Sequence, residues 1–163
     1  MKTRPEPPSG PALLRRARLA VGLPLPTALG VALLDDADPA AGAVLAVSGL
    51  VDGGAGAAHA GALAVLLEAA GYLAVAPSLR ADEHAVTHSS ATTLVRAAGV
   101  GETVVARGAL DRRTRRLAFV TVTATVGEDV VARAALVKSV VARPPDLTSG
   151  TAAAARRASR PTT

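Results

Sequence analysis

Apolar residues change their spacing along the chain, and the change separates a helical part from a strand-rich part. Residues 60–76 contain no proline, are rich in Ala and Leu, and form a stretch longer than most strands, so they are predicted to be helical. Apolar side chains lie on every side of this predicted helix. Because such a helix must be covered by protein on most sides, the rest of the chain is predicted to surround it.

Downstream of that helix the pattern indicates strands. ETVVARGAL (102–110), RRLAFVTVTATV (115–126) and DVVARAALVKSVVA (129–142) are rich in β-branched residues, and the turn-like segments DRRT and GED separate them. In the second run Val120, Val122, Ala124 and Val126 alternate with Phe119 and three threonines, which is the period of two expected for a strand. A further strand is predicted near 85–95.

Upstream, ALLRRARLAVG (12–22) predicts a short amphipathic helix closed off by Gly22 and Pro24. Residues 29–51 predict an antiparallel hairpin, because two apolar runs flank a turn rich in Asp, Pro and Gly. Residues 1–12 and 144–163 show no apolar periodicity, so we predict disordered tails around a domain at 13–143. The order of elements predicts an α+β domain in which an antiparallel sheet wraps round one long central helix.

Composition limits the core and the chemistry. A chain of 163 residues has the size of one domain with a substantial core. Half of the residues are hydrophobic, but Tyr72 and Phe119 are the only aromatic ones, so Ala, Val and Leu must fill that core. The absence of cysteine excludes a disulfide scaffold, a thiolate zinc site and a cysteine nucleophile. We expect no metal and no cofactor.

The net charge of +5 is unevenly distributed. Residues 1–18 and 143–163 together hold nine Lys or Arg and two acidic residues, whereas residues 19–142 hold nine and eleven. The predicted domain therefore lacks the basic face and the stacking aromatics of a nucleic-acid reader, and nucleic acid is not an expected partner. Three arginines and two prolines between residues 15 and 26 interrupt what a signal peptide would keep apolar, and glycines and Glu68 break the apolar stretch 53–79. We expect a cytoplasmic protein without a membrane partner.

One carboxylate stands in the most apolar segment. Glu68 is the only Asp, Glu, Lys or Arg between Asp52 and Arg80. An ionised carboxylate in apolar surroundings is costly unless it is paired or hydrogen-bonded, and buried carboxyl groups are frequent participants in acid–base chemistry. Glu68 is therefore a candidate catalytic group. The alternatives are a position on a solvated stripe of the helix or a structural ion pair with an arginine such as Arg96 or Arg107.

The start of the same helix is a second candidate feature. The loop DGGAGAAHAG brings His59, Ala60 and Gly61 to the first turn. Backbone N–H groups there have no helical partner and the helix dipole favours negative charge, so such a terminus can stabilise an oxyanion.

Taken together, these residues resemble the hotdog-fold acyl-CoA thioesterases of the phenylacetate-pathway (PaaI) type. In that family the helix opens with His-Gly-Gly and carries an Asp or Glu nine residues after the His. Here His59, Ala60, Gly61 and Glu68 occupy those places. The resemblance continues through AVTHSSATTLVRAAGVGETVVARGALDRRTRRLAFVTVTATV, covers roughly residues 28–142, and implies a hotdog fold.

The resemblance also implies hydrolysis of an acyl-CoA thioester. Glu68 would act as nucleophile, through a mixed anhydride, or as the base that activates water. The Ala60 N–H would bind the thioester carbonyl, and Thr87 would stand near the attacking water. His59 would order the loop, with a role as general base as the alternative.

Substrate contacts are expected from the same region. Gly61 keeps the second glycine of the family motif, Gly53 stands where members carry Asn or Gln, and Tyr72 stands where some carry Thr. The arginines of segment 112–116 would meet the phosphates of CoA or, alternatively, form a solvated hairpin tip.

Helix geometry predicts that the site needs two chains. Ala60 and Glu68 are eight residues apart, which along one helix means a separation of about 12 Å and about 80° in direction. No thioester carbon can lie within about 3 Å of the carboxylate and still accept a hydrogen bond from that N–H. We therefore expect a homodimer or homotetramer in which Glu68 of one subunit faces Ala60 of another, as the paired-sheet dimers of the family provide.

Other folds and sites fit the sequence less well. A Rossmann fingerprint fails in register, because Gly54 and Gly56 would need a glycine where His59 stands. No Asp and His pair of a hotdog hydratase is present. A fluoroacetyl-CoA-thioesterase-like site would combine Glu68 with Thr87 and His88, but neighbouring strand residues point to opposite faces unless a bulge intervenes.

The alternative from a different functional class is a non-catalytic hotdog module that binds acyl-CoA or an acyl carrier. The changed residues Gly53 and Ala60 favour it. His84 and His88 are expected to be surface or edge residues.

Overall fold

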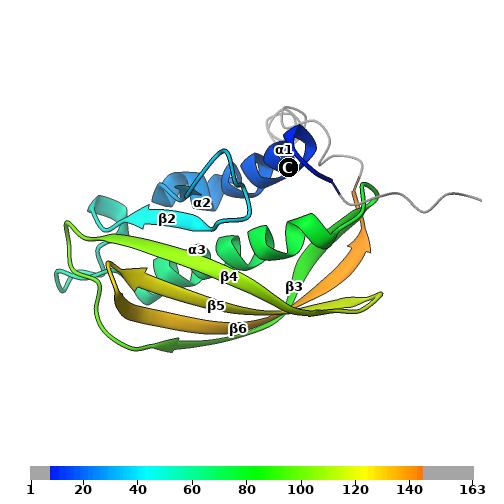
Figure 1. Ribbon diagram of the computed structural model, residues 1–163. Helices are drawn as coiled ribbons and strands as arrows, with labels where there is room; N and C mark the ends of the chain where they lie inside the picture. Colours follow the sequence, from blue (N-terminus) through cyan, green and yellow to red (C-terminus); the bar gives the residue numbers. More distant parts are fainter. Residues whose placement is uncertain (1–7, 145–163) are drawn as a thin grey trace, which may run out of the picture.

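The computed structural model describes residues 8–144 (Figure 1). Three α-helices, two short 3-10 helices (η) and six strands follow one another in this range. Their bounds are α1 Pro11–Val21, α2 Pro24–Leu29, β1 Ala32–Leu33, β2 Ala43–Ala46, η1 Gly49–Val51, α3 Ala60–Val75, η2 Ala76–Ser78, β3 Glu83–Leu94, β4 Thr103–Arg113, β5 Leu117–Val126 and β6 Asp129–Ala142.

All six strands belong to one antiparallel sheet in the order β1-β2-β4-β5-β6-β3. Strands β4, β5 and β6 form successive hairpins, whereas β3 comes earlier in the chain and pairs with β6 at the edge. The sheet curls round α3, and α1 and α2 lie on the other side of that helix (Figure 1). This is the hotdog fold, and the predicted α+β arrangement around one central helix is confirmed.

Helix α3 is the core of the fold. Nine of its sixteen residues are buried, so it is covered on most of its circumference, as its composition predicts. Residues 60–78 are long and apolar enough to cross a membrane by length and composition alone, but most of this stretch is buried inside the protein. It therefore forms the core helix of this fold.

Glycines let α3 and the sheet approach closely. A Cβ atom on Gly108 of β4 would lie 2.8 Å from the carbonyl oxygen of Ala70 and 2.8 Å from the Cβ of Ala74, both on α3. A Cβ on Gly71 of α3 would lie 2.3 Å from Cδ1 of Leu136 on β6. A core built from small side chains thus brings the helix backbone close to the sheet.

The predicted alternation of β5 is confirmed. Val120, Val122 and Ala124 are buried against the core, whereas Thr121 between them is exposed. The predicted hairpin upstream of α3 is also present as the antiparallel pair β1 and β2, although β1 has only two residues.

The structure corrects three local predictions. Pro24 does not only close the first helix: it begins α2, where its fixed φ and missing N–H suit the first helical turn. Helix α1 begins at Pro11, inside the segment 1–12 assigned to the tail. The segment DRRT is not a turn, because β4 runs to Arg113 with a register shift after Leu110 and leaves only residues 114–116 between the strands. The remaining tail predictions, 1–7 and 145–163, lie outside the described residues.

We predict that Gly108→Ala lowers the free energy of unfolding by about 1–3 kcal/mol, because the added methyl group meets the backbone oxygen of Ala70 and must push α3 away from β4. Urea denaturation followed by circular dichroism measures the change. Gly99→Ala is the matched control, since a Cβ there would meet its nearest atom at an ordinary 3.7 Å. Equal midpoints for both variants would contradict close packing at Gly108.

Candidate active site

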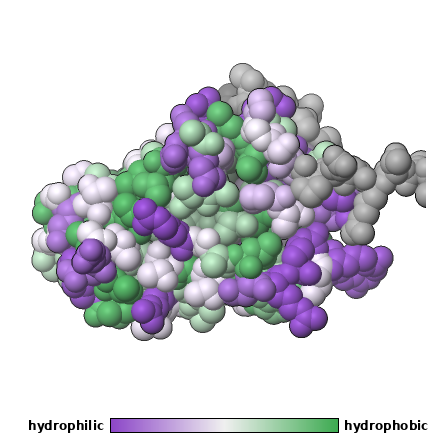
Figure 2. All heavy atoms as spheres, viewed as in Figure 1, coloured by the Kyte–Doolittle hydropathy of each residue, from purple (hydrophilic) through white to green (hydrophobic). Residues whose placement is uncertain are grey.

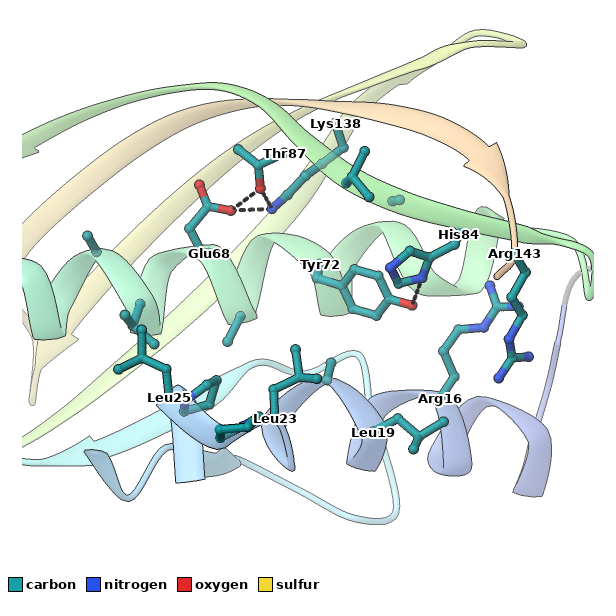
Figure 3. A pocket seen from close by; sticks show the side chains of 18 residues that line it. Arg16, Leu19, Leu23, Leu25, Glu68, Tyr72, His84, Thr87, Lys138 and Arg143 are labelled. Carbon is teal, nitrogen blue, oxygen red and sulfur yellow. Dashed lines mark hydrogen bonds and ion pairs between the residues drawn. The ribbon is translucent and has the colours of Figure 1, made fainter. Parts of the chain in front are cut away.

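Three side chains from three elements meet around the carboxylate of Glu68 (Figure 3). Glu68 projects from α3, and its Oε2 atom accepts a hydrogen bond of 2.6 Å from the Thr87 hydroxyl on β3. The ammonium group of Lys138 on β6 forms an ion pair with the same oxygen and donates a 2.9 Å hydrogen bond to Thr87. The three polar groups form a closed triangle at the surface of α3 that faces β3.

Strand pairing brings Lys138 to this point. Thr87 on β3 and Lys138 on β6 are directly opposite each other in the antiparallel register. The next pair is Ser89 with Val137, so His88 is an extra residue in a β-bulge. His88 is exposed, and its Nδ1 lies 3.2 Å from the hydroxyl of Ser139. The bulge thus falls at His88, but within residues 8–144 His88 forms no hydrogen bond or ion pair with Glu68.

Lys138 is the main element of the site that the sequence analysis missed. Its side chain is only 4% exposed, which is rare for lysine and requires a charged or polar partner. Glu68 supplies that partner, and the Glu68 side chain itself is 30% exposed. The expected structural partners are not involved, because Arg96 pairs with Glu102 and Asp129 and Arg107 makes no ion pair within the described chain.

The arrangement leaves one carboxylate oxygen available. Both hydrogen bonds to Glu68 end on Oε2, and Oε1 has no hydrogen-bond partner within residues 8–144. A carboxylate anchored through one oxygen is fixed in orientation, while the other oxygen can meet a water molecule or a carbonyl carbon.

The start of α3 presents a free backbone donor. His59 is the N-cap, and its Nδ1 accepts a 3.0 Å hydrogen bond from the N–H of Gly61. The Ala60 N–H, by contrast, makes no hydrogen bond within the described residues, and Ala60 is exposed. Thus Gly61 is engaged by the cap, and Ala60 carries the N–H that is open to a ligand.

Backbone hydrogen bonds to two other segments hold the loop before α3. The N–H of Ala58 donates to the carbonyl of Ala98, next to Gly99, and the N–H of His59 donates to the carbonyl of Val51, each at 2.8 Å. The N–H of Gly99 donates a 2.6 Å hydrogen bond to Glu102, and this bond lowers the pKa of Glu102. Gly53 is exposed in this loop, where its N–H donates to Ala57.

A cavity of about 760 Å³ extends from Glu68, Thr87 and Lys138 along α3 to the N-terminal helices. Its walls are mainly apolar, with Leu19 from α1, Leu23 from the short link between α1 and α2, and Leu25 from α2. Across the middle of the face shown in Figure 2 the surface is mostly apolar. No local sequence pattern indicates that α1 and α2 line this space.

Polar residues return at the other end of the cavity. Tyr72, one helical turn after Glu68, places its hydroxyl 3.2 Å from Nδ1 of His84. Arg16 and Arg143 lie beyond this pair in Figure 3. Burial raises the pKa of Tyr72 and lowers those of His84 and Arg16, and Arg16 and Arg143 lower the His84 pKa further. His84 is thus a half-buried cavity residue on the edge strand.

The arginines of segment 112–116 serve at least one structural purpose. Arg113 donates a 3.0 Å hydrogen bond to the buried Glu83, which also pairs with Arg80. Arg112, Arg115 and Arg116 are exposed. Hydrophilic residues gather on the lower right of Figure 2, where Figure 1 places the turn between β4 and β5.

The predicted residues therefore fall into two separate groups. Glu68, Thr87 and Tyr72 line the cavity, whereas Gly53, His59, Ala60 and Gly61 lie at the N-terminal end of α3. Because α3 is continuous between Ala60 and Glu68, the estimated separation of about 12 Å holds within one chain. Within the described part of the chain, no three His, Asp or Glu side chains come together to hold a metal ion.

Comparison with known proteins identifies the class of fold. Residues 55–133 match the family model of the thioesterase superfamily. A thioesterase from Haemophilus influenzae superposes with a TM-score of 0.70 at 18% identity, covering 85% of this chain and 94% of that one. No curated protein matches the chain by sequence.

Two further structures extend the comparison. A mutant of the phenylacetic acid degradation protein PaaI from Thermus thermophilus has a TM-score of 0.63 at 27% identity, covering 71% of this chain and 97% of that one. A protein from Bacillus halodurans, solved with CoA, has a TM-score of 0.58 at 22% identity, covering 61% of this chain and 70% of that one. The resemblance to hotdog thioesterases is therefore confirmed.

We predict that Glu68 and Lys138 are energetically coupled. Either Glu68→Gln or Lys138→Met leaves the other charge without its partner, so the double variant should be less destabilised than the sum of the single variants, by about 1–3 kcal/mol. Urea unfolding of all four proteins measures this coupling. Additivity within about 0.5 kcal/mol would show that the ion pair contributes nothing specific to stability.

Proposed function

Because this hotdog protein matches the thioesterase superfamily over residues 55–133, we propose that it is an acyl-CoA thioesterase of the PaaI type with Glu68 as its catalytic carboxylate. The observation that carries the proposal is the anchored carboxylate: Glu68 is held through Oε2 by Thr87 and Lys138 and borders a cavity large enough for an acyl group. The other oxygen, Oε1, takes no part in this anchoring and can meet a water molecule or a carbonyl carbon.

Two routes are compatible with this geometry. As a general base, Glu68 accepts a proton from water, and the resulting hydroxide adds to the thioester carbon; the C–S bond then breaks and the CoA thiolate takes up a proton. As a nucleophile, Oε1 adds to the carbon and expels CoA, and water hydrolyses the mixed anhydride. In both routes Lys138 and Thr87 are positioning residues that orient the carboxylate. We expect Thr87 also to lie near the attacking water.

The developing oxyanion needs a donor that Glu68's own subunit does not supply. We propose that the Ala60 N–H of a second subunit provides it, with His59 holding the first turn of that helix in place. Gly61, Gly53 and Tyr72 would contact the substrate. The alternative role of His59 as a base is less favoured, because its Nδ1 already accepts the N–H of Gly61.

The edge strand β3 is the proposed dimer contact. It is twelve residues long, pairs with β6 alone among the strands within residues 8–144, and exposes nine of its residues from Val86 to Leu94. A long strand with one unpaired edge is a template for pairing with another strand. Pairing β3 with its copy would join two sheets and cover Thr87. We propose a homodimer, or a homotetramer built from two such pairs, in the cytoplasm, with no membrane or nucleic-acid partner.

Acyl-CoA is the proposed substrate. The structural neighbour from Bacillus halodurans was solved with CoA. The shared fold can therefore accommodate the CoA portion of an acyl-CoA substrate. The exposed Arg112, Arg115 and Arg116 are available to meet phosphates, whereas Arg113 is engaged with Glu83.

The second candidate function is a hotdog module that binds acyl-CoA or an acyl carrier without cleaving it. Its support is the loop before α3, where Gly53 offers no side chain to the ligand and Ala60 replaces a glycine of the family motif. Binding without turnover would distinguish this module from an enzyme.

We predict that the purified protein releases CoA from at least some members of an acyl-CoA panel and that Glu68→Gln lowers kcat at least about 100-fold, since the amide can neither accept the proton nor form the anhydride. Thiol release followed with a chromogenic reagent measures the rate. Glu128→Gln, at an exposed turn, is the matched control. Equal turnover by wild type and Glu68→Gln would remove Glu68 from the mechanism.

We predict that Ala60→Pro also lowers kcat, by about 100-fold, while the protein remains folded. Proline deletes the N–H but suits the first helical position, and His59 before it already has φ −64° and ψ 135°, which proline requires of its predecessor. Ala60→Gly, which keeps the N–H, is the control.

Mixing the two inactive variants then tests whether two subunits share each site. Each mixed dimer of Glu68→Gln and Ala60→Pro has one intact site, so a random mixture should recover up to about a quarter of the wild-type activity. Formation of mixed dimers is checked by native mass spectrometry. Mixed dimers that remain inactive would refute the shared site.

A further inference from the structure

We propose that the acyl group of the substrate ends in a carboxylate, and that Arg16 binds this carboxylate at the end of the cavity opposite Glu68. The inference rests on the proposed thioesterase function and names its substrate class, the CoA monothioesters of dicarboxylic acids. Arg16 is thereby assigned as the residue that selects the far end of the acyl chain.

The first observation is the state of Arg16 itself. It is only 5% exposed, although it lies on a short N-terminal helix. Its Nη2 donates a 2.9 Å hydrogen bond to the carbonyl of Arg80, but the buried Nη1 has no hydrogen-bond partner within residues 8–144. A buried guanidinium with an unused donor is unfavourable, and such groups in native proteins call for an explanation. A ligand oxygen would satisfy it.

The second observation is the charge around Arg16. Within the described residues Arg16 makes no ion pair, because the nearby carboxylate of Glu83 pairs with Arg80 and Arg113. Lys138 adds positive charge to the same cavity, and Glu68 is the only acidic side chain among the described residues that line it. Glu68 is paired with Lys138. The Arg16 end of the cavity therefore carries positive charge that an anionic ligand group would balance.

The third observation is the path between the two ends. Figure 3 shows Glu68 and Arg16 at opposite ends of the cavity, with Leu23 and Leu25 along one wall. These walls suit a chain of methylene groups, and the polar pair of Tyr72 and His84 comes only near Arg16. Tyr72 follows Glu68 by one helical turn, a rise of about 6 Å, so the cavity runs along α3 for at least the length of a six-carbon acyl chain.

An acyl carboxylate fits this end better than a phosphate of CoA. The phosphates are bulky and strongly hydrated, and moving them past Glu68 along apolar walls would cost most of that hydration without compensation. A single carboxylate is smaller, and an arginine can hold it through two parallel hydrogen bonds. The phosphates of CoA are therefore expected to remain on the surface.

The test compares adipyl-CoA with hexanoyl-CoA, which differ only in ending with a carboxylate or a methyl group. Wild-type kcat/KM should be at least about tenfold higher for adipyl-CoA. Arg16→Met should remove that preference by lowering adipyl-CoA turnover while hexanoyl-CoA turnover stays within about twofold. Arg15→Met is the matched control, because Arg15 is exposed on the same helix and its loss changes the net charge equally. Arg15→Met should behave as wild type.

Pantetheine thioesters of the same two acids separate the two sources of negative charge. They lack the nucleotide and its phosphates, so a preference for adipyl that persists with them arises from the acyl carboxylate. Loss of the preference with pantetheine esters, equal or better use of hexanoyl-CoA by the wild type, or a preference that survives Arg16→Met would each overturn the proposal. The wild-type comparison decides the matter even if Arg16→Met does not fold.

Failure of the proposed function gives a different result. In that case neither thioester is hydrolysed, and calorimetric titration of wild-type protein with the two esters reports binding alone. Tighter binding of adipyl-CoA, lost in Arg16→Met and kept in Arg15→Met, would support the carboxylate site without catalysis. Equal affinities would overturn the site as well.

Discussion

Helix α3 has apolar side chains on every face, and the gain in free energy from hiding them governs the placement of all other elements. A sheet alone covers one side of a helix, so the curled sheet and the N-terminal helices together enclose it. Because the core contains almost no aromatic side chains, enclosure requires close approach, which Gly108 and Gly71 permit. The cavity lies where this covering is incomplete, between α3, the start of β3 and the N-terminal helices.

The charged side chain on α3 lies where neighbouring strands supply hydrogen-bond and ion-pair partners. Glu68 can remain on α3 because Lys138 and Thr87 reach it from neighbouring strands, and each of the three groups makes the burial of the others less costly. The result is an apolar cavity with Glu68, Thr87 and Lys138 at one end and Arg16 and Arg143 at the other. A substrate of the proposed class would have its reactive carbon at the first and its distal group at the second.

Much of this arrangement follows from local sequence patterns. The composition of residues 60–76 predicts α3 and its burial, the period of two predicts β5, and the isolated charge in an apolar run singles out Glu68. The sequence does not single out Lys138, because it lies in an ordinary strand pattern. Its role depends on the register of β6 against β3, which pairs residues far apart in the chain. The sequence does not single out Arg16 either, because basic residues on an amphipathic helix usually face solvent. Its burial depends on how α1 packs against the rest of the protein. Both are consequences of tertiary packing that no local pattern encodes.

Tyr72 has an incidental consequence for optical work on this protein. It is the only tyrosine, and the chain has no tryptophan, so near-ultraviolet absorbance and fluorescence come almost entirely from one ring that borders the cavity. Its hydroxyl is next to His84, which makes its emission sensitive to whatever displaces that contact. The wild-type molecule thus carries its own reporter of occupancy, with no added label.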